Sequence, residues 1–552
     1  MRYLKNLGTR QTPQWEPIPG SAQVPNSAGG YAWAVDDWTR LDRFLVLGSE
    51  GGSYYATERQ LTRENAEAVL RCVEADGPRA VRRVVEVSEA GRAPKNDPAL
   101  FVLALCAADG EEATRKAALE ALPRVARTGT HLMHFAAYVE QFRGWGRGLR
   151  RAVAAWYNER ALDDLALQVV KYQQRDGWSH ADLLRLAHPQ TGDGARNALY
   201  RWIVDGREAV PDLAALPALV AALERAREAR TRDEVVALVR EHRLPREAVP
   251  TEWLREAAVW EALLDDMPMT ALIRNLATLT RVGLVVPGAE ATRRVVAQLG
   301  DEDRLRKARV HPIQVLAALK TYASGRGARS DTTWTPVPQV VDALDRAFYA
   351  AFGNVPATGK RWLLALDVSG SMDGSTVAGV PGLTPRVAAA AMALVTANTE
   401  RNHTIVGFTS AGGDWYGQST DVQDVSGLSP LVISPRQRLD DVVTYTANLP
   451  FGGTDCSLPM RWALKNRVEV DVFAIYTDSE TWAGPQAPAQ ALQRYRREVN
   501  PGAKLVVVGM VSNGFTIADP DDAGMLDVVG FDTATPAVIA DFATGQVVGS
   551  AA

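Results

Sequence analysis

The sequence predicts a multidomain protein in which an all-α domain of stacked helices precedes an α/β domain with a doubly wound parallel sheet. From about residue 36 to residue 352 the hydrophobic period is helical nearly throughout. From residue 361 short apolar strands alternate with helices, as in βαβ units. A chain of 552 residues is also too long for one hydrophobic core. We expect an irregular segment at residues 1–30, the helical domain at 31–355 and the α/β domain at 356–552.

The helical part consists of amphipathic segments joined by short breaks of Gly, Pro, Asp or Thr. They are Leu61–Ala75, Thr114–Arg127, Leu149–Tyr157, Leu162–Tyr172, His180–Ala187, Leu213–Arg227, Asp233–Glu241, Met269–Val282, His311–Tyr322 and Val340–Phe352. No fixed sequence period emerges. Many similar helices without strand signals nevertheless favour an α-solenoid. Residues Asn354–Lys360 are the expected linker to the second domain.

The second domain alternates predicted strands and helices. The strands are Trp362–Leu366, Thr404–Phe408, Val470–Tyr476, Leu505–Val511 and Leu526–Phe531, and the helices are Pro385–Arg401, Arg438–Asn448, Ser457–Arg467 and Ala487–Val499. In a doubly wound sheet, ligands bind outside the carboxyl ends of the strands, where the strand order reverses.

Polar oxygens follow the first of these strands. Asp367, Ser369 and Ser371 stand at alternate positions directly after the apolar run. Thr454 lies on the glycine loop Gly452–Asp455, and Asp478 ends the run Val470–Thr477. Oxygen ligands of this kind suit a hard cation such as Mg²⁺. Each piece alone is also explained by a turn or a helix cap, but all three in order predict a metal site.

This arrangement resembles the metal-ion-dependent adhesion site of von Willebrand factor A domains. The resemblance implies that Ser369, Ser371 and Thr454 are direct ligands of a divalent cation, for which Mg²⁺ is the expected ion. It implies that Asp367 and Asp478 act through water. Such a site leaves one metal position open for an acidic residue of a partner. A purely structural metal that braces three loops is an equal alternative.

Charge is unevenly distributed along the chain. Residues 113–202 hold 14 Lys and Arg against 8 Asp and Glu, whereas residues 357–552 hold 13 against 20. Only the first region should attract phosphate. Its aromatic residues could stack on bases, but they also suit a helical core, and the cations suit a solvated helix face. The basic positions that we regard as RNA candidates include Arg124, Arg127, Arg147 and Arg150.

The composition bears on the cellular compartment, on membrane association and on catalysis. The three cysteines show no metal or redox spacing, which indicates a reducing compartment. No apolar run approaches the length of a membrane span, and the first twenty residues have no signal-peptide core. We therefore expect a cytoplasmic protein that does not enter membranes. No nucleophile–base pair, P-loop or zinc-protease motif appears, so we expect no enzyme.

The whole chain resembles the Ro autoantigen family of TROVE-domain RNA-binding proteins, in a bacterial version. The resemblance rests on the segments Phe44–Tyr55, Gly129–Leu132, Lys171–His180, Pro268–Leu276, His311–Pro312, Gly453–Cys456 and Thr477–Thr481. It implies a ring of HEAT-like helical repeats closed by a von Willebrand A domain. It further implies that small Y RNAs bind the outer surface and that single-stranded ends of misfolded RNAs enter a basic hole.

The resemblance also assigns residues and partners. Family positions for Y RNA binding align with Lys171, Arg175 and His188, and we expect the first two to share one helix face. His180 should lie near them, and Arg274 is the candidate inside the ring. For His188 a capping role, and for Arg274 a buried ion pair, are the alternatives. An exoribonuclease, polynucleotide phosphorylase, is the implied protein partner, and a ring closed within one chain suggests a monomer.

Two other function classes remain open. One is a metal-dependent protein-interaction module on an α-solenoid scaffold with no RNA role. The other is a Mg²⁺-dependent nuclease, which would need carboxylates and cations at one place. The separation of the acidic and basic regions along the sequence argues against the nuclease.

Overall fold

The computed structural model of the protein describes residues 11–48, 58–327, 331–352, 357–374, 376–377, 383–411, 419–434, 436–449, 452–529 and 535–545. The chain divides into two compact units. The first, here the sheet unit, comprises Met1–Val69, His311–Lys320 and Phe348–Ala552. The second, the helical unit, comprises Leu70–Val310 and Thr321–Ala347. The predicted boundary at residues 355 and 356 lies outside the described residues, as does the Ser49–Tyr55 part of the first quoted segment.

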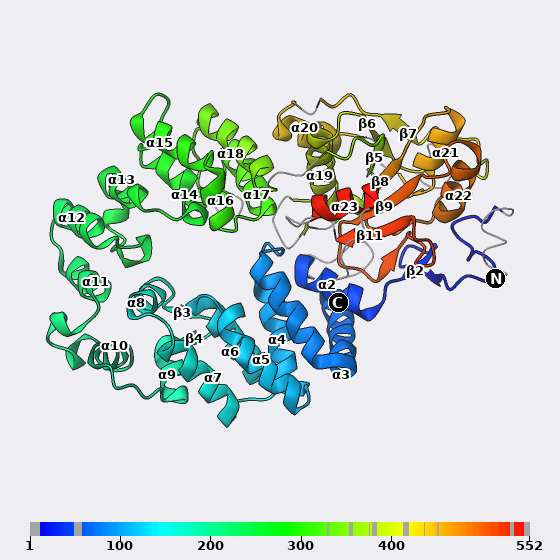
Figure 1. Ribbon diagram of the computed structural model, residues 1–552. Coiled ribbons are helices and arrows are strands. Elements are labelled where there is room, and N and C mark those ends of the chain that lie inside the picture. Colours follow the sequence, from blue (N-terminus) through cyan, green and yellow to red (C-terminus); the bar gives the residue numbers. More distant parts are fainter. Residues whose placement is uncertain are drawn as a thin grey trace. The chain divides into compact units, whose positions relative to one another are not determined.

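Helices that follow one another in sequence make up the helical part of the chain (Figure 1). They are α2 (Asp37–Leu47), α3 (Glu58–Ala90), α4 (Asp97–Asp109), α5 (Glu112–Val125), α6 (Gly129–Phe142), α7 (Arg147–Asn158), α8 (Leu162–Lys171), α9 (His180–Ala187), α10 (Gly194–Asp205), α11 (Ala218–Glu228), α12 (Arg232–His242), α13 (Ala257–Asp265), α14 (Met269–Arg281), α15 (Glu290–Leu299), α16 (Glu302–Lys307), α17 (Pro312–Ala323) and α18 (Pro338–Ala350). Many of them pack on near neighbours in sequence, for example α4 on α5 and α6, and α12 on α13. The predicted all-α stack of helices is therefore confirmed.

The apolar period explains why these helices pack as they do. In α7 the side chains of Leu149, Val153 and Trp156 are buried, at spacings of four and three residues. Arg147 and Arg150 on the same helix are exposed. One face of α7 therefore enters the core while the other carries cations at the surface.

One feature of the helical unit departs from the prediction. Two short strands, β3 (Gln174–Arg175) and β4 (Trp178–Ser179), pair antiparallel between α8 and α9. Asp176 and Gly177 link them, with φ values of 52° and 79°. Two successive positive φ angles in a two-residue loop are typical of a tight hairpin turn, for which Asp-Gly is a preferred sequence. The predicted helix Leu162–Tyr172 ends one residue earlier than expected, at Lys171, and the hairpin that follows it was not predicted.

The sheet unit holds a six-stranded sheet in the order β11-β9-β8-β5-β6-β7. The strands are β5 (Trp362–Asp367), β6 (His403–Phe408), β7 (Leu428–Pro430), β8 (Val472–Thr477), β9 (Lys504–Gly509) and β11 (Met525–Val529). All neighbours pair parallel except β6 and β7. The chain first builds outward from β5 through β6 and then returns to β8 on its other side. The carboxyl ends of β5 and β8 therefore meet where the strand order reverses.

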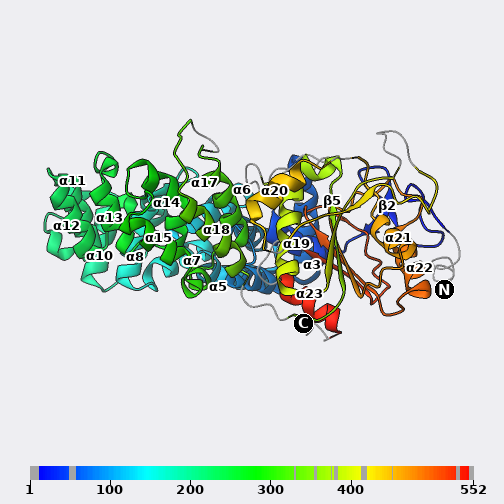
Figure 2. The same ribbon diagram turned by 90° about the horizontal axis from the view of Figure 1, so that it is seen from above.

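Helices cover both faces of this sheet, as Figure 2 shows for α19 on one side of β5 and for α21 and α22 on the other. The helices are α19 (Pro385–Thr399), α20 (Leu439–Ala447), α21 (Leu458–Lys465), α22 (Pro488–Glu498) and α23 (Thr535–Thr544). Every residue of β5 and β8 is buried, so both strands are apolar without alternation. The predicted α/β domain is thus confirmed, with an antiparallel edge strand added.

The N-terminal segment belongs to the sheet unit. Strands β1 (Val24–Pro25) and β2 (Tyr31–Ala34) form a small antiparallel sheet with β10 (Phe515–Thr516). Ile18 and Trp33 are 1% and 3% exposed and pack into the same hydrophobic core as the faces of β5 and β8. Much of this segment is without regular structure, as predicted, but its apolar residues contribute to the core of the unit.

Candidate metal centre and nucleic-acid interface

The predicted oxygens at the end of β5 lie together. Asp367 is fully buried, and its Oδ1 accepts a 2.9 Å hydrogen bond from the Ser369 backbone N–H. The hydroxyls of Ser369 and Ser371 are 3.0 Å apart. The short helical turn Gly370–Asp373 holds the second serine beside the first. The alternate spacing in the sequence therefore brings two buried hydroxyls and one carboxylate to the same end of the strand.

The end of β8 supplies the second carboxylate. Thr477 donates a 2.7 Å hydrogen bond to Asp367 Oδ2, which ties the end of β8 to the end of β5. Asp478 follows at once and is 2% exposed. Burial raises the pKa of the Asp478 carboxyl and the nearby Ser371 side chain opposes this, so the residues after both strands lie close together.

The glycine loop brings the third hydroxyl. Thr454 is 1% exposed, and its Oγ1 has no hydrogen-bond partner among the described residues. A buried hydroxyl without a partner is unfavourable unless a ligand completes it. The loop is positioned by contacts with residues after β6: Thr409 donates to the carbonyl of Gly453, and the Gly453 N–H donates to Ser410 Oγ at 3.2 Å.

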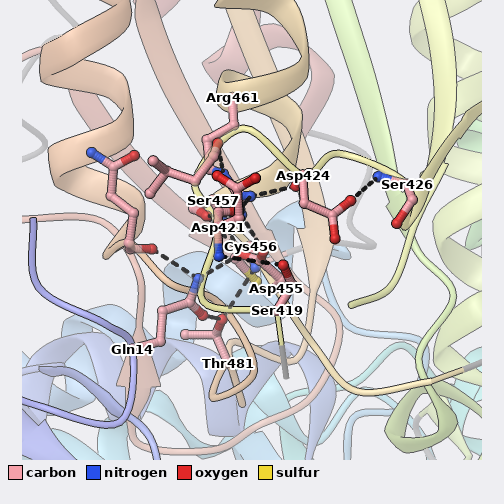
Figure 3. A network of polar contacts seen from close by, with 12 residues as sticks. Gln14, Ser419, Asp421, Asp424, Ser426, Asp455, Cys456, Ser457, Arg461 and Thr481 are labelled. Carbon is pink, nitrogen blue, oxygen red and sulfur yellow. Dashed lines mark hydrogen bonds and ion pairs between the residues drawn. The ribbon is translucent and has the colours of Figure 1, made fainter. Parts of the chain in front are cut away.

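A buried ion pair fixes the residue next to Thr454. Arg461 of α21 donates a 2.7 Å hydrogen bond to Asp455 Oδ2, and both side chains are at most 2% exposed. Ser457 and Gln14 each donate a 2.6 Å hydrogen bond to Asp455 Oδ1. Figure 3 shows this network, in which Thr481 also bonds to Gln14 and the guanidinium of Arg461 faces the segment that holds Asp421 and Asp424.

Sequence reasoning did not find Gln14 or Arg461. Gln14 lies 441 residues before Asp455 in a segment without regular structure, so no local pattern indicates its role. Arg461 occupies an apolar helix face, where an arginine is unusual unless it is paired. That exception in an otherwise apolar face was a usable signal.

Electrostatics around the two aspartates favour a bound cation. Burial raises the pKa of the Asp478 carboxyl well above its usual range, and the neighbouring Asp367 and Glu480 carboxylates raise it further. Burial also raises the pKa of Asp367, which Ser369, Thr477 and the positive charge of Arg386 oppose. Arg386 donates to the carbonyls of Val368 and Ser369 and pairs with Asp373 at 3.0 Å. Two buried carboxylates beside the Ser369 and Ser371 hydroxyls would gain from a divalent ion.

The donor set is typical of a hard cation. Within the described residues, no three His, Cys, Asp or Glu side chains gather as a metal cluster, so any cation here would depend on the hydroxyl oxygens. The unpaired Thr454 hydroxyl and the two buried aspartates match the oxygen chemistry that Mg²⁺ prefers. Cys456 beside them is fully buried, and burial raises the pKa of its thiol, which makes it a poor nucleophile.

The candidate RNA residues Lys171 and Arg175 do not lie on one helix. Lys171 ends α8, with its Nζ 5.4 Å from the centre of the Tyr172 ring, whereas Arg175 lies in β3. The expected one-face pairing is wrong, because the Asp176-Gly177 turn forms a hairpin instead. Arg175 remains exposed, with only a 3.8 Å contact to Asp176.

His134 anchors this hairpin. It bonds through Nδ1 to Asp176, and its Nε2 lies 3.5 Å from Asp97 Oδ1. The imidazole is only about 9% exposed. Contacts between α6 and both hairpin strands add to this anchor. Arg175 is therefore presented to solvent by a turn that the core of the helical unit holds.

His180 is not at the surface. Its side chain is 2% exposed, shares a 2.6 Å hydrogen bond with the Tyr157 hydroxyl and stacks on Trp156. The expectation that it faces RNA is therefore wrong. Ser179 caps the N-terminus of α9, and the first turn of that helix directs the His180 ring into the core.

The burial of His180 predicts acid sensitivity. Burial lowers the pKa of His180 from 6.5 to about 4. As the pH falls below 6.5, His180 becomes protonated in the unfolded chain, but in the folded chain it stays neutral until about pH 4. The free energy of unfolding therefore decreases between pH 6.5 and pH 4, and this contribution does not change further below pH 4. The loss is about 3 kcal/mol. Chemical denaturation at several pH values, comparing wild type with His180→Gln, measures this; an equal pH dependence in both would contradict the role of His180.

The other candidate arginines differ in whether they pair with neighbouring residues. Arg124 pairs with Glu89 at 2.7 Å, and Arg127 donates to the carbonyl and hydroxyl of Ser88. Both are engaged with the end of α3. Arg147 and Arg150 are exposed and have no acidic partner within the described ranges.

His188 and Arg274 complete the set. His188 is exposed and is the left-handed C-cap residue of α9, with φ of 47°. The capping alternative therefore describes its backbone, while its imidazole is free to meet a ligand. Arg274 is exposed on α14, so the alternative of a buried ion pair is wrong.

Comparison with known proteins identifies related sequences over nearly the whole chain. The model of the TROVE domain matches residues 24–208 and 241–360, and the model of the Ro60 vWA domain matches residues 361–543. A protein of Deinococcus radiodurans, named RNA-binding protein RO60, is 46% identical over 546 residues, which are 99% of each chain. A Caenorhabditis elegans protein of the same name is 36% identical and covers 95% of this chain and 90% of its own.

A solved structure of a related protein also matches this one. The crystal structure of Deinococcus radiodurans RO (RSR) protein matches with a TM-score of 0.67 and 46% identity, covering 93% of this chain and all of that one. None of the helices in the described part of the chain has the length and apolar character to cross a bilayer. The matches span both units and nearly the full length, and the chain therefore belongs to the Ro60 family, in which a TROVE domain is joined to a Ro60 vWA domain.

Proposed function

We propose that this protein binds RNA: small structured RNAs of the Y RNA class on the outer face of its helical repeats, and single-stranded ends of misfolded RNAs in a central hole. It acts as a chaperone or scaffold in RNA quality control. The observation that carries the proposal is the exposed Arg175 on the anchored β3–β4 hairpin, four residues after Lys171. Two relatives that bear the name RNA-binding protein support it.

Contacts inside the helical unit support a ring. Gly91, which follows α3, is a neighbour of Arg309, which follows α16. A carbon added at Gly91 would lie 3.4 Å from the Cβ of Arg309. Burial lowers the pKa of Arg127, and the charge of Arg309 lowers it further. Cations from the first and last parts of the unit thus stand close together. A single strand of RNA carries one phosphate per nucleotide and would be attracted to such a place.

One experiment tests the RNA proposal. The protein is purified from its own cells, and the bound nucleic acid is extracted and sequenced. We expect one abundant small structured RNA, with polynucleotide phosphorylase present only when that RNA is intact. Absence of RNA favours the metal-dependent protein-interaction module instead, and Mg²⁺-dependent cleavage of added RNA would indicate a nuclease.

We propose further that the site at the ends of β5 and β8 holds Mg²⁺. Ser369, Ser371 and Thr454 would supply its direct ligands, and Asp367 and Asp478 would act through water. A bound ion would supply an open position for an acidic side chain of a protein partner. The protein's own contribution would be to hold the three hydroxyls buried at one point. The hydrogen bond from Thr477 to Asp367 and the ion pair between Arg461 and Asp455 support this arrangement.

Calorimetric titration tests the metal proposal. Mg²⁺ added to the wild-type protein should release or absorb heat with saturation, and the Ser369→Ala/Ser371→Ala variant should show only heat of dilution. Loss of two of three direct ligands leaves too few oxygens for the ion. Mn²⁺ provides a second probe of the same site. Equal heats in both proteins would contradict the assignment.

A further inference from the structure

A groove with a cationic wall lies between α5 and α7. It has a volume of about 780 Å³, and the loop between α6 and α7 contributes to its lining. Gly148 permits the close approach of the two helices, because a carbon added there would lie 3.0 Å from Leu119 of α5. All of the groove lies within the helical unit.

The groove is lined by more positive than negative side chains. Its cations are Arg115, Lys116, Arg143, Arg147 and Arg151, and its acids are Glu112, Glu120 and Glu159. Lys116 is 3.9 Å from Glu120, and both are exposed. Arg115 and Arg143 donate to the carbonyls of Gly110 and Ala108. Arg147 and Arg151 have no acidic partner in the described part of the chain, and they stand one helical turn apart on α7.

The start of α7 adds to this positive potential. Gly146 is the N-cap and has no side chain to accept from the first N–H groups, and the first turn holds no acid. Those N–H groups have no carbonyl partner within the helix. Cations at a helix N-terminus oppose the helix dipole, so Arg147 is unfavourably placed until an anion binds.

The groove is joined to the hairpin that carries Arg175. Trp145 lies in the loop between α6 and α7, and its ring centre is 5.4 Å from that of Trp178 in β4. The two aromatic rings thus link the groove to the proposed RNA contact at Lys171 and Arg175. The hairpin is thus in direct contact with the loop between α6 and α7, part of which lines the groove.

We propose that the α5–α7 groove is a second phosphate-binding site, which takes the sugar-phosphate backbone of the RNA beyond the hairpin contact. The inference rests on the proposed RNA function and adds a site to it. Arg147 and Arg151 bind phosphates, and the free amides at the start of α7 bind one of them. Guanidinium groups pair with phosphate oxygens in two parallel hydrogen bonds, which suits this wall.

Substitutions at Gly146 separate RNA binding from folding. Gly146 has φ of −108°, which any residue adopts, and a carbon added there meets nothing within 4 Å. Asp and Asn both cap helices better than Gly, so neither Gly146→Asp nor Gly146→Asn should lower the melting temperature. Gly146→Asp adds a negative charge to the groove and should weaken RNA binding by roughly tenfold at 0.1 M salt. Gly146→Asn occupies the same N–H groups without adding a charge, so it should lose less affinity than Gly146→Asp.

The binding assay uses a fluorescein-labelled stem-loop RNA with a single-stranded tail, titrated at several salt concentrations. Arg147→Ala/Arg151→Ala should reduce the salt slope by about two phosphate contacts. If this variant and Gly146→Asp bind like wild type while Lys171→Ala/Arg175→Ala does not, the groove proposal fails and RNA binding stands. If wild type binds no RNA, the proposed function itself fails.

A terminal phosphate is the other source of the same chemistry. The assay is therefore repeated with a 5′-hydroxyl and a 5′-phosphate form of the RNA. Equal losses on both forms support a backbone site. Losses confined to the 5′-phosphate form would overturn the backbone assignment and place an RNA end in the groove.

Discussion

The Arg461→Met variant should unfold with a free energy lower than that of wild type by about 3–5 kcal/mol, because it leaves a buried charge without its partner. Asp455 is fully buried, and Arg461 is the cation that opposes the effect of that burial on the Asp455 pKa. Methionine fills a similar volume, so packing changes little. Denaturant titration of the two proteins at neutral pH measures the difference.

The matched control removes the charge on both sides. Asp455→Asn keeps an oxygen that can accept from Ser457 and Gln14, as the carboxylate does now. The double variant Arg461→Met/Asp455→Asn should therefore recover a large part of the lost stability. An Arg461→Met protein as stable as wild type would show that the network contributes little. Because Asp455 follows Thr454, the single variant should also weaken Mg²⁺ binding in the calorimetric titration.

The Lys171→Ala/Arg175→Ala variant should bind a stem-loop RNA on the order of 50-fold more weakly at 0.1 M salt, since two phosphate contacts are lost. The slope of log affinity against log salt should fall by about two contacts for the same reason. Arg175 is 59% exposed and Lys171 ends a helix, so the fold should not change. Fluorescence titration across a salt series measures both quantities.

A second double variant controls for net charge. Arg232→Ala/Arg293→Ala removes the same charge from the helical unit, but both arginines already pair with neighbouring acids, Asp233 and Glu290. RNA affinity should change little. If the two double variants lose the same affinity, the hairpin is not a specific contact and the RNA is held by overall charge alone.

The candidate metal site could be predicted because its parts are local. A buried parallel strand is an apolar run, and the first polar residue after it lies at the sheet edge. Asp367 and Asp478 could thus be placed at neighbouring strand ends without coordinates. The Gln14 contact could not be predicted, because it joins positions 441 residues apart and one partner has no periodic pattern.

The hairpin at Asp176 shows a different limit. Asp-Gly between two short segments is a hairpin signal, yet the four-residue spacing of Lys171 and Arg175 favours one helix face. The consequence was specific: Arg175 was placed on a helix face and His180 at the surface. Burial of His180 depends on Tyr157 and Trp156 of a preceding helix, a tertiary contact that a polar residue type does not reveal.

The N-terminal segment has a consequence for how the protein is made. Thr12 bonds to Gln490, Gln14 to Asp455 and Asn26 to Thr481, so these residues have partners at least 441 positions later in the sequence. Until those later residues have been synthesised, the apolar Ile18 and Trp33 lack the core that buries them. A nascent chain arrested before residue 455 would therefore expose this segment to chaperones and proteases, while the helices between can already fold.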